Sequence, residues 1–473
     1  MPLPKPIRQL KINSLTWMIG GSSLLLFVCS SIRHALFESS AWDLGIFDQA
    51  VYLISQGKPP ISSFIEFHIL GDHAAWVFYP LALLYKIYPD VHWLFAVQAI
   101  ALSLGALPTW YLARQAGLKE AQATTMAVVY LLYPLIFNVN LFDFHPEVMA
   151  LPALLGAILA ARLGRVLWFS VAIFFILGCK AVLALTVAAM GVWLLVFEKT
   201  GESTKRNAIA LIAIVAGVAW FLIATQLIIP SFSGTEALAL NRYAYLGNSV
   251  LEIGKNLLLK PGLVLGNVFS LDTLEYLGLL VLPVIWGLSP QHLTPLVGAI
   301  PTLLLNILSE SPAQRNLVHQ YSLPILPFLV VAAIATLASG RGWLQNRRWV
   351  ILWSFVAFLA LAKYGYFGSI YLDSLDTWQA TRDAIAYIQP HGSVLTPPQV
   401  APHLTHRPIV KVAITGSESA KLSEFEYVLL NLRHPGFGST PQVAATLLER
   451  LKTMPEFQLT YQSDDVYLFE KRS

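Results

Sequence analysis

Apolar segments long enough to cross a lipid bilayer recur along most of this chain, and they constrain its fold more than any other feature. A helix needs about 20 mainly apolar residues to cross the roughly 30 Å hydrocarbon layer of a membrane. Several segments are shorter, and 166–197 could be one broken span or two short ones. The eleven candidate spans are residues 15–32, 91–112, 122–138, 148–162, 166–178, 181–197, 208–229, 275–289, 292–308, 321–339 and 348–367.

The composition also predicts an integral membrane protein. Apolar residues make up 56% of the 473 residues and charged residues 12%, about half of the roughly 25% usual in soluble domains. A disulfide-stapled secreted scaffold is excluded, because Cys29 and Cys179 are the only cysteines and both lie in apolar runs. The net charge of +4 predicts no nucleic-acid partner, because the basic residues are scattered between apolar segments.

Basic residues in the short loops predict the orientation of the chain. Loops rich in Lys and Arg stay on the cytoplasmic side. With eleven spans, the N-terminus is then inside and the C-terminus outside. The first segment lacks a small-residue cleavage site, so we expect an anchor there and not a signal peptide. The basic residues of the predicted cytoplasmic side are Lys5, Arg8, Lys11, Arg114, Lys119, Arg162, Arg165, Lys199, Lys205, Arg206, Arg341, Arg347 and Arg348.

The chain divides into a transmembrane domain, residues 1–368, and a soluble extracytoplasmic domain, residues 369–473, which is richer in charge. The transmembrane domain carries two long outer segments, 33–90 and 230–274, that are too polar to span. Alternating and helical patterns predict a small α/β fold for the soluble domain. Its expected strands are 394–396, 409–414, 427–432 and 466–470, and its expected helices are 377–388 and 441–454.

Within the first outer segment, apolar residues repeat at helical spacing from Leu44 through Phe47 and Val51 to Ile54. This spacing predicts an amphipathic helix lying along the membrane surface. The stretch 76–88 is apolar but short, and we expect it to be partly embedded, since a span there would reverse the side of every later loop.

The same segment holds Asp43, Asp48 and His73, which are candidates for chemistry. A carboxylate at the membrane face could act as a general base, and carboxylate and imidazole groups together could bind Mg²⁺ or Mn²⁺. The alternative is that Asp43 caps the surface helix, a position where Asp is common. Asp43 and Asp48 lie about 140° apart around a helix, so both cannot face one ligand from it.

A short outer loop between the third and fourth spans contains Asp143, His145 and Glu147. Pro146 disfavours helix at His145, and an extended loop would turn the three alternating side chains to one side. They are candidate metal ligands. The alternative is that the carboxylates cap helix ends and His145 lies among lipid headgroups.

Lys180 has apolar residues on both sides. A charge at the centre of a membrane helix costs roughly 2.5–3.5 kcal/mol on insertion scales, so we expect Lys180 to face a cavity or a partner, such as a phosphate. The alternative is that its side chain extends to the outer headgroups. His319 and Tyr321 follow Arg315 at the outer start of the tenth span, where an anionic group could bind. No phosphate-binding glycine loop, zinc motif or nucleophile elbow is present.

Taken together, six motifs resemble a bacterial membrane family, domain of unknown function family 2079 (DUF2079), over about residues 35–430. That family is similar to the glycosyltransferase-C superfamily of polytopic enzymes, which use polyprenyl-phosphate-linked sugars on the extracytoplasmic side. The motifs are Trp42 to Gln49, His73, Asp143 to Pro146, Lys180, His319 to Phe328 and Pro402 to Arg407.

The resemblance implies an inverting glycosyltransferase in the bacterial inner membrane. Asp43 matches the first-loop carboxylate that acts as catalytic base or orients the acceptor, and Lys180 matches a lysine that contacts the donor phosphate. Asp143 and His145 match a loop that binds metal or substrate, so a divalent cation is an expected cofactor. The expected partners are a polyprenyl-phosphate sugar donor, an acceptor of unknown kind and membrane lipids. Residues expected to bind substrate or phosphate are Lys180, His73, His319, Tyr321 and Asp48.

Two other functions fit the same sequence. A transporter or lipid flippase would also carry charged residues within spans, although the chain shows no inverted halves with matching broken helices. A non-catalytic envelope assembly factor, whose outer domain binds a partner protein, is the third interpretation.

Overall fold

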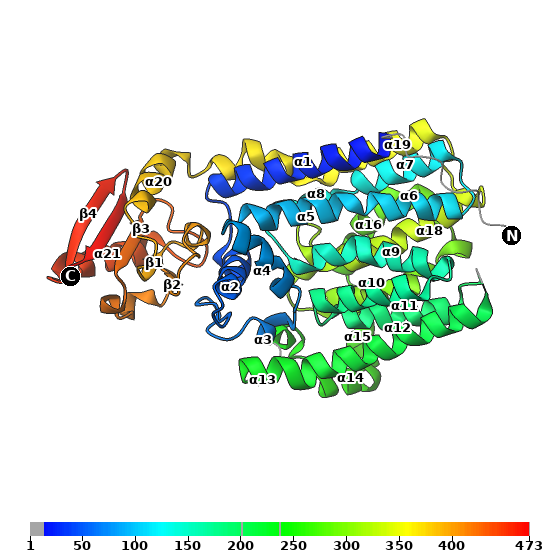
Figure 1. The fold of residues 1–473 in the computed structure, drawn as a ribbon, viewed down its shortest axis with the longest axis horizontal. Coiled ribbons are helices and arrows are strands. Elements are labelled where there is room, and N and C mark those ends of the chain that lie inside the picture. The colour runs from blue at the N-terminus through cyan, green and yellow to red at the C-terminus, as the bar shows by residue number, and fades with distance from the viewer. Residues whose placement is uncertain (1–13, 200–201, 236–237, 473) are drawn as a thin grey trace.

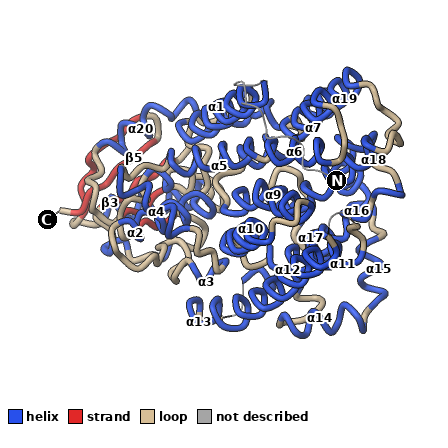
Figure 2. The backbone as a smooth tube through the Cα atoms, turned by 45° about the vertical axis from the view of Figure 1, so that its right-hand side comes forward, coloured by secondary structure: helices blue, strands red, loops and turns tan. Residues whose placement is uncertain are grey.

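The computed structural model describes residues 14–199, 202–235 and 238–472. A bundle of helices forms most of the molecule, and a small sheet with its own helices lies at one end of the bundle (Figures 1 and 2). Most bundle helices run along the longest axis of the molecule. The predicted helical membrane fold with a small C-terminal α/β part is therefore present.

Nineteen α-helices precede the C-terminal part within the described residues. They are α1 (Ser14–Ala35), α2 (Ile46–Ser55), α3 (Leu70–His73), α4 (Phe78–Ile87), α5 (His92–Leu104), α6 (Ala106–Gln115), α7 (Glu120–Leu131), α8 (Pro134–Leu141), α9 (Ala150–Arg162), α10 (Val166–Cys179), α11 (Leu183–Val196), α12 (Ser203–Ile223), α13 (Ile229–Ser233), α14 (Val250–Leu259), α15 (Pro261–Val268), α16 (Leu271–Val281), α17 (Ile300–Leu308), α18 (Leu326–Ala338) and α19 (Arg347–Leu361).

Each of the eleven predicted spans falls on one of these helices or on a helical pair. Among the described residues, five helices are long and apolar enough to cross a membrane, and seven are if each of two bent pairs counts as one span. The bent pairs turn by 52° within 261–287 and by 43° within 347–372. Several other apolar helices are shorter, including α10 and α11. The number eleven stays a prediction.

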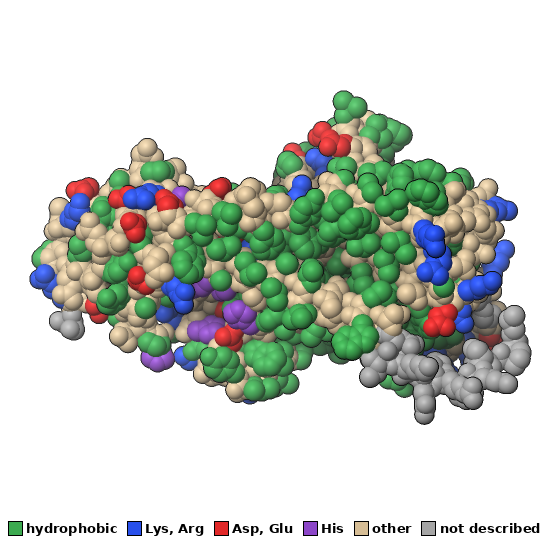
Figure 3. Space-filling view, turned by 90° about the horizontal axis from the view of Figure 1, so that it is seen from above, with side chains coloured by type: hydrophobic (Ala, Val, Ile, Leu, Met, Phe, Trp, Pro, Cys, Tyr) green, Lys and Arg blue, Asp and Glu red, His purple; other side chains and the backbone are tan. Residues whose placement is uncertain are grey.

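Large apolar side chains are exposed along the sides of the bundle. On α10, Leu167, Trp168, Val171 and Phe174 are all more than half exposed, and Figure 3 shows apolar side chains over much of the helical part. Soluble monomers rarely expose apolar patches of this extent, whereas a lipid-facing surface requires them. The structure thus has the surface of a multi-pass membrane protein.

The basic loops lie at the end of the bundle that is far from the sheet (Figure 3). At this end Arg162 forms an ion pair with Glu198, with 2.9 Å between Nε and Oε2, and Arg347 lies near Glu120 at the edge of a shared cavity. The clustering at one end is what the basic residues predict. Lys5, Arg8 and Lys11 lie outside the described residues.

The apolar face of α2 packs against protein, whereas its amphipathic pattern led us to expect contact with lipid; the orientation of α2 along the membrane surface stays a prediction. Leu44, Phe47 and Val51 are almost completely buried, and α2 packs against α4. Phe47 stacks on Phe78 of α4 at 5.2 Å between ring centroids. The apolar stripe was correctly identified, but its partner is the neighbouring protein helix, which a single-helix pattern cannot reveal.

The C-terminal part is a five-stranded sheet of order β2-β1-β3-β5-β4. Strands β1, β2 and β3 are parallel, and β5 is antiparallel to β3 and β4. Helix α20 packs against β4 and β5, and α21 packs against β3 and β4. The elements are β1 (Val394–Thr396), β2 (Val410–Val412), β3 (Tyr427–Asn431), β4 (Phe457–Ser463), β5 (Val466–Lys471), α20 (Trp378–Ala386) and α21 (Pro441–Thr453).

Strand β4 is the one element of this sheet that the sequence pattern missed. It lies at the edge of the sheet, all of its residues except Phe457 are exposed or half-buried, and its pairing with β5 shifts between Leu459 and Tyr461. The strand nevertheless alternates apolar and polar residues from Phe457 to Gln462, so its signal was present in the sequence and was overlooked.

Helices α11 and α12 pack closely through glycine. A Cβ atom on Gly217 of α12 would lie 2.5 Å from the carbonyl oxygen of Ala184 and 2.7 Å from the amide nitrogen of Ala188. Small residues permit such close contact between membrane helices, where packing and not hydrophobic burial drives association.

We therefore expect Gly217→Ala to lower the unfolding temperature of the purified protein, because α12 must move away from α11. The cost of overpacking is roughly 1–3 kcal/mol. Gly156→Ala in α9 is the matched control, since a Cβ there meets no atom within 4 Å and alanine favours the helix. Thermal unfolding in detergent compares the two, and equal effects would contradict the packing argument.

Candidate active site

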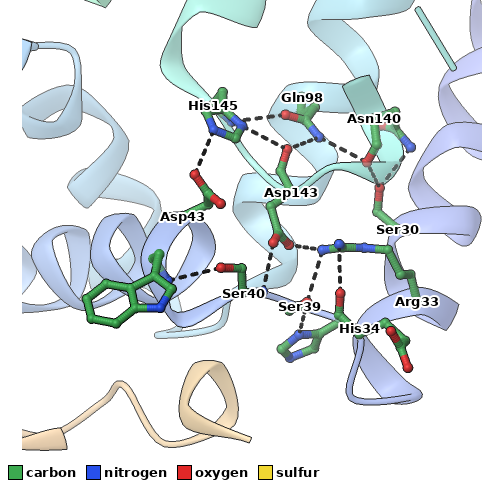
Figure 4. A network of polar contacts seen from close by, with 12 residues as sticks. Ser30, Arg33, His34, Ser39, Ser40, Asp43, Gln98, Asn140, Asp143 and His145 are labelled. Atoms are coloured by element: carbon green, nitrogen blue, oxygen red, sulfur yellow. Dashed lines mark hydrogen bonds and ion pairs between the residues drawn. The ribbon is translucent and has the colours of Figure 1, made fainter. Parts of the chain in front are cut away.

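Asp43 lies on a single π-helical turn, Ala41–Gly45, that leads directly into α2. Ser40 caps this turn, because its hydroxyl accepts a hydrogen bond from the amide of Trp42 at 3.1 Å. The alternative interpretation, in which Asp43 caps the helix, is therefore wrong. Oδ1 of Asp43 instead lies 3.1 Å from Nε2 of His145 (Figure 4).

The loop that carries His145 is held by Gln98 of α5. The side-chain amide of Gln98 donates to the carbonyl oxygens of Asp143 at 3.0 Å and Asn140 at 3.3 Å, and its Oε1 accepts from the amide of His145 at 3.2 Å. Asp143 has a φ of 107°, a left-handed conformation that is strained for a residue with a side chain. These three hydrogen bonds fix the strained loop and so the position of the His145 ring.

The side chains of Asp143 and His145 point in different directions. The expectation that all three loop side chains face one side is therefore wrong. The Asp143 carboxylate forms an ion pair with Arg33 of α1 and accepts a hydrogen bond from the amide of Ser40 at 2.8 Å. The left-handed φ at Asp143 breaks the extended geometry, so alternation does not apply there. Asp143 connects α1, the π-helical turn and the loop (Figure 4).

Lys180 separates α10 from α11 and has an extended backbone, so the run 166–197 forms two helices. Its Nζ lies 2.6 Å from Oε1 of Glu147, and the Lys180 side chain is only 12% exposed. Lys180 therefore has a protein partner and does not extend to the lipid headgroups. The pairing offsets the free-energy cost of burying each charge, which would be high for an unpaired charge in a site of low dielectric.

The first outer segment fixes the break at Lys180. The amide of Ala181 donates to the carbonyl oxygen of His73 at 2.9 Å, and the amide of Val77 donates to that of Gly178 at 3.1 Å. Trp76 lies directly against Gly178, where no Cβ could fit. The segment that carries Asp43 therefore also positions Lys180.

Aromatic and cationic side chains complete the site. Phe142 stacks on His145 at 5.3 Å and meets His319 edge-on at 4.0 Å. Lys180 and Arg242 both lie over the ring of Tyr321, at 5.9 Å and 5.2 Å from its centroid. Nothing in the sequence distinguishes Arg242 from other basic residues of the second outer segment, so the sequence interpretation missed it.

The charges around Asp43 keep its carboxylate ionised. Burial raises the pKa of Asp43, but the hydrogen bond and charge of His145, with the charges of His319 and Lys180, lower it more, and the pKa lies below the usual value. Two buried polar atoms nearby, Oε2 of Glu147 and Nδ1 of His319, have no hydrogen-bond partner in the described part of the chain. Such atoms usually have one, so they are available to a ligand.

Two other predicted residues differ in their place: His73 lies close enough to Lys180 and Glu147 to interact with them electrostatically, whereas Asp48 has other partners. The His73 ring contacts its own neighbour Asp72, with Nδ1 2.9 Å from the Asp72 carbonyl oxygen. Asp48 is buried and accepts hydrogen bonds from Tyr85 and Thr405, and its Oδ2 lies 3.2 Å from Nε2 of His406. Asp43 and Asp48 share none of these partners, as their helical spacing leads one to expect.

The candidate metal ligands do not form a joint set in this arrangement. Asp143 is paired with Arg33, Glu147 with Lys180 and His145 with Asp43. No group of three His, Cys, Asp or Glu residues is placed to hold a metal ion within 14–199, 202–235 and 238–472. A divalent cation therefore remains a prediction from the sequence.

Comparison with known proteins gives the family. A family model described as a predicted membrane protein, DUF2079, matches residues 33–468. The chain belongs to this family. The expectation from the sequence motifs is thus confirmed. None of the curated proteins matches the sequence of this DUF2079 member.

Solved structures resemble the chain to different degrees. ArnT from Cupriavidus metallidurans bound to undecaprenyl phosphate has a TM-score of 0.56 at 12% identity, with 97% of this chain and 98% of ArnT covered. Apo ArnT from the same organism gives 0.48 at 12% identity, over 96% and 97% of the two chains. An oligosaccharyltransferase from Archaeoglobus fulgidus gives 0.42 at 10% identity, over 88% and 70%. The first match shows that the DUF2079 chain has the fold of ArnT over nearly its whole length.

The Arg33–Asp143 ion pair gives a prediction about stability. We expect Arg33→Gln and Asp143→Asn each to destabilise the protein by roughly 3–5 kcal/mol, because each leaves a buried charge without its partner. The double variant should lose clearly less than the sum of the two. Unfolding of all three variants in detergent measures this coupling, and strict additivity would show that the pair is not formed.

The contact between Asp48 and His406 predicts a pH dependence. Burial lowers the pKa of His406, but the charge and hydrogen bond of Asp48 raise it more, and the pKa lies above the usual value of 6.5. The stabilisation is therefore complete below pH 6.5 and is lost as the pH rises through the raised pKa. We therefore expect the unfolding temperature to fall as the pH is raised from 6 to 8.5. The fall should be smaller in His406→Gln than in His391→Gln, which replaces an exposed histidine and serves as the control.

Proposed function

We propose that this protein transfers a sugar from a polyprenyl-phosphate-linked donor to an acceptor hydroxyl at the extracytoplasmic face of a bacterial inner membrane, with inversion at the anomeric carbon. The observation that carries the proposal is the convergence of Asp43, His145, Lys180 and Arg242, brought together from four separate segments. The shared fold with ArnT, which is bound to undecaprenyl phosphate in its structure, supports a lipid-phosphate donor.

Asp43 would act on the acceptor. Its side chain is 25% exposed, and the adjacent His145 is almost completely buried, so the carboxylate can receive a hydroxyl while the imidazole holds it in place. As the acceptor oxygen forms its bond to the anomeric carbon, the hydroxyl proton passes to Asp43. His145 acts as a positioning residue.

Lys180 and Arg242 would act on the leaving group. The bond between the anomeric carbon and the phosphate oxygen breaks, and the lipid phosphate departs with the bonding electrons. Two cations over the same Tyr321 ring would stabilise the developing negative charge in a site of low dielectric. Attack from the side opposite the leaving phosphate inverts the anomeric centre.

The sidedness of the proposal follows from the charge distribution. Asp43 leads into α2, which lies beside the C-terminal sheet, whereas the basic loops lie at the opposite end of the bundle (Figures 1 and 3). Since basic loops stay in the cytoplasm, Asp43 and the C-terminal domain would be extracytoplasmic.

The first test replaces Asp43. We expect Asp43→Asn to reduce sugar transfer by at least 100-fold, within the range usual for a lost general base, and to leave the unfolding temperature nearly unchanged. The assay follows radiolabelled sugar from polyprenyl-phosphate donors into a membrane extract. Asp464→Asn in the β4–β5 turn is the control. Unchanged transfer by Asp43→Asn would overturn the assignment of Asp43.

The second test concerns the phosphate. Lys180→Met combined with Glu147→Gln removes both buried charges, so folding is spared, and we expect donor binding to weaken by at least tenfold. Lys255→Met on exposed α14 is the control. Uptake of solute into proteoliposomes without chemical change would instead favour a transporter, and transfer in the presence of EDTA tests the predicted divalent cation.

A further inference from the structure

A second possible binding site lies where the helical bundle meets the C-terminal domain. A cavity of about 560 Å³ is present there, within the range usual for small-molecule sites. Its lining comes from the end of α1, from α2, from the start of α5, from α20 and from the run Pro402 to Arg407. Figure 3 shows histidine side chains gathered at this junction.

The charged groups of the cavity largely neutralise each other. Nδ1 of His92 lies 2.6 Å from Oδ1 of Asp90, and Nε2 of His406 lies 3.2 Å from Oδ2 of Asp48. Arg407 donates its guanidinium hydrogens to the backbone carbonyl oxygens of Leu404, Gln389 and Gly392. Such a lining offers hydrogen-bond donors and acceptors, but it has little net charge to attract a strongly charged ligand.

The remaining walls are flat and mostly uncharged. His34 and His403 stack on each other at 3.8 Å, and burial lowers the pKa of His403 to about 4. Trp378 lines the cavity beside them, with Arg382 over its ring at 5.3 Å. An aromatic ring such as Trp378 next to hydrogen-bonding groups suits the apolar face and hydroxyl edges of a sugar, whereas a lipid chain would offer those groups no further hydrogen bond.

We infer that this cavity binds a neutral sugar unit of the acceptor, at a site distinct from the Asp43 site. That the bound sugar is the acceptor rests on the proposed function, whereas the binding of a sugar in this cavity does not. Asp48 lines the cavity and Asp43 does not. The two residues are separated by only about 7–8 Å along one helical segment. Because the two side chains lie about 140° apart around that segment, one sugar unit cannot contact both, and only a longer oligosaccharide that passes around the segment would reach Asp43.

The motif Pro402 to Arg407 then has a role in binding. It brings His403 and His406 of the C-terminal domain to the cavity, while Thr405 donates to Asp48 of α2. The cavity exists only when this domain lies against the bundle. The C-terminal domain is therefore part of the binding site for the acceptor.

Saturation-transfer NMR on the full-length protein in nanodiscs tests this inference, with maltose and N,N′-diacetylchitobiose as neutral probes and glucuronate as the anionic comparison. We expect saturation transfer to at least one neutral sugar, with at least fivefold weaker binding in His92→Ala and in His406→Ala. His92 is 46% exposed, so its replacement should not disturb folding. His391→Ala, outside the cavity lining, is the control.

Asp43→Asn separates this inference from the proposed function, because it should abolish sugar transfer but leave maltose or chitobiose binding unchanged. If transfer survives in Asp43→Asn while His92→Ala still weakens sugar binding, the catalytic proposal fails and the cavity site stands. No saturation transfer to either neutral sugar, equal binding in His92→Ala and wild type, or stronger binding of glucuronate would each overturn the inference.

Discussion

The outer end of this protein depends on the pairing of charges that have been taken out of water. A single buried charge costs several kcal/mol, and a partner with good geometry offsets most of that cost. Arg33 is paired with Asp143 and Lys180 with Glu147, and the Asp43 carboxylate lies within hydrogen-bond distance of His145. Each pair joins segments that are far apart in the sequence, so the pairs hold the first outer segment, the short loop and the break before α11 in one arrangement.

The same segment connects the membrane part with the C-terminal domain. Gln49 donates to the carbonyl oxygen of Arg407 at 3.0 Å, and Ser63 donates to that of Val410 at 2.8 Å. With the contact between Asp48 and His406, these bonds attach the edge of the sheet at β2 to α2 and to the loop that follows α2. The two carboxylates of α2 and its preceding turn thus have different tasks: Asp43 lies next to the cations of the site, and Asp48 lies at the domain junction.

These features give the proposed enzyme a physical basis. Gln98 holds the strained loop at Asp143 before any substrate arrives, so the position of His145 and the direction of Asp43 are set in advance. Preorganised groups of this kind stabilise charge without reorganisation during the reaction. The placement of Lys180 and Arg242 over one aromatic ring extends this arrangement to an anionic leaving group.

The sequence by itself determined the helical membrane class, the positions of the apolar helical segments, the α/β character of the C-terminal domain and Asp43, His145 and Lys180 as residues of interest. These follow from local properties: hydropathy, periodicity, and the cost of a lone charge in an apolar run. Only the tertiary structure decided that Arg33 forms an ion pair with Asp143, that the apolar face of α2 packs on protein and not on lipid, and that Arg242 and Lys180 both lie over the Tyr321 ring. Such partners depend on which segments meet in space, and the sequence pattern of one segment carries no information about which other segment it contacts.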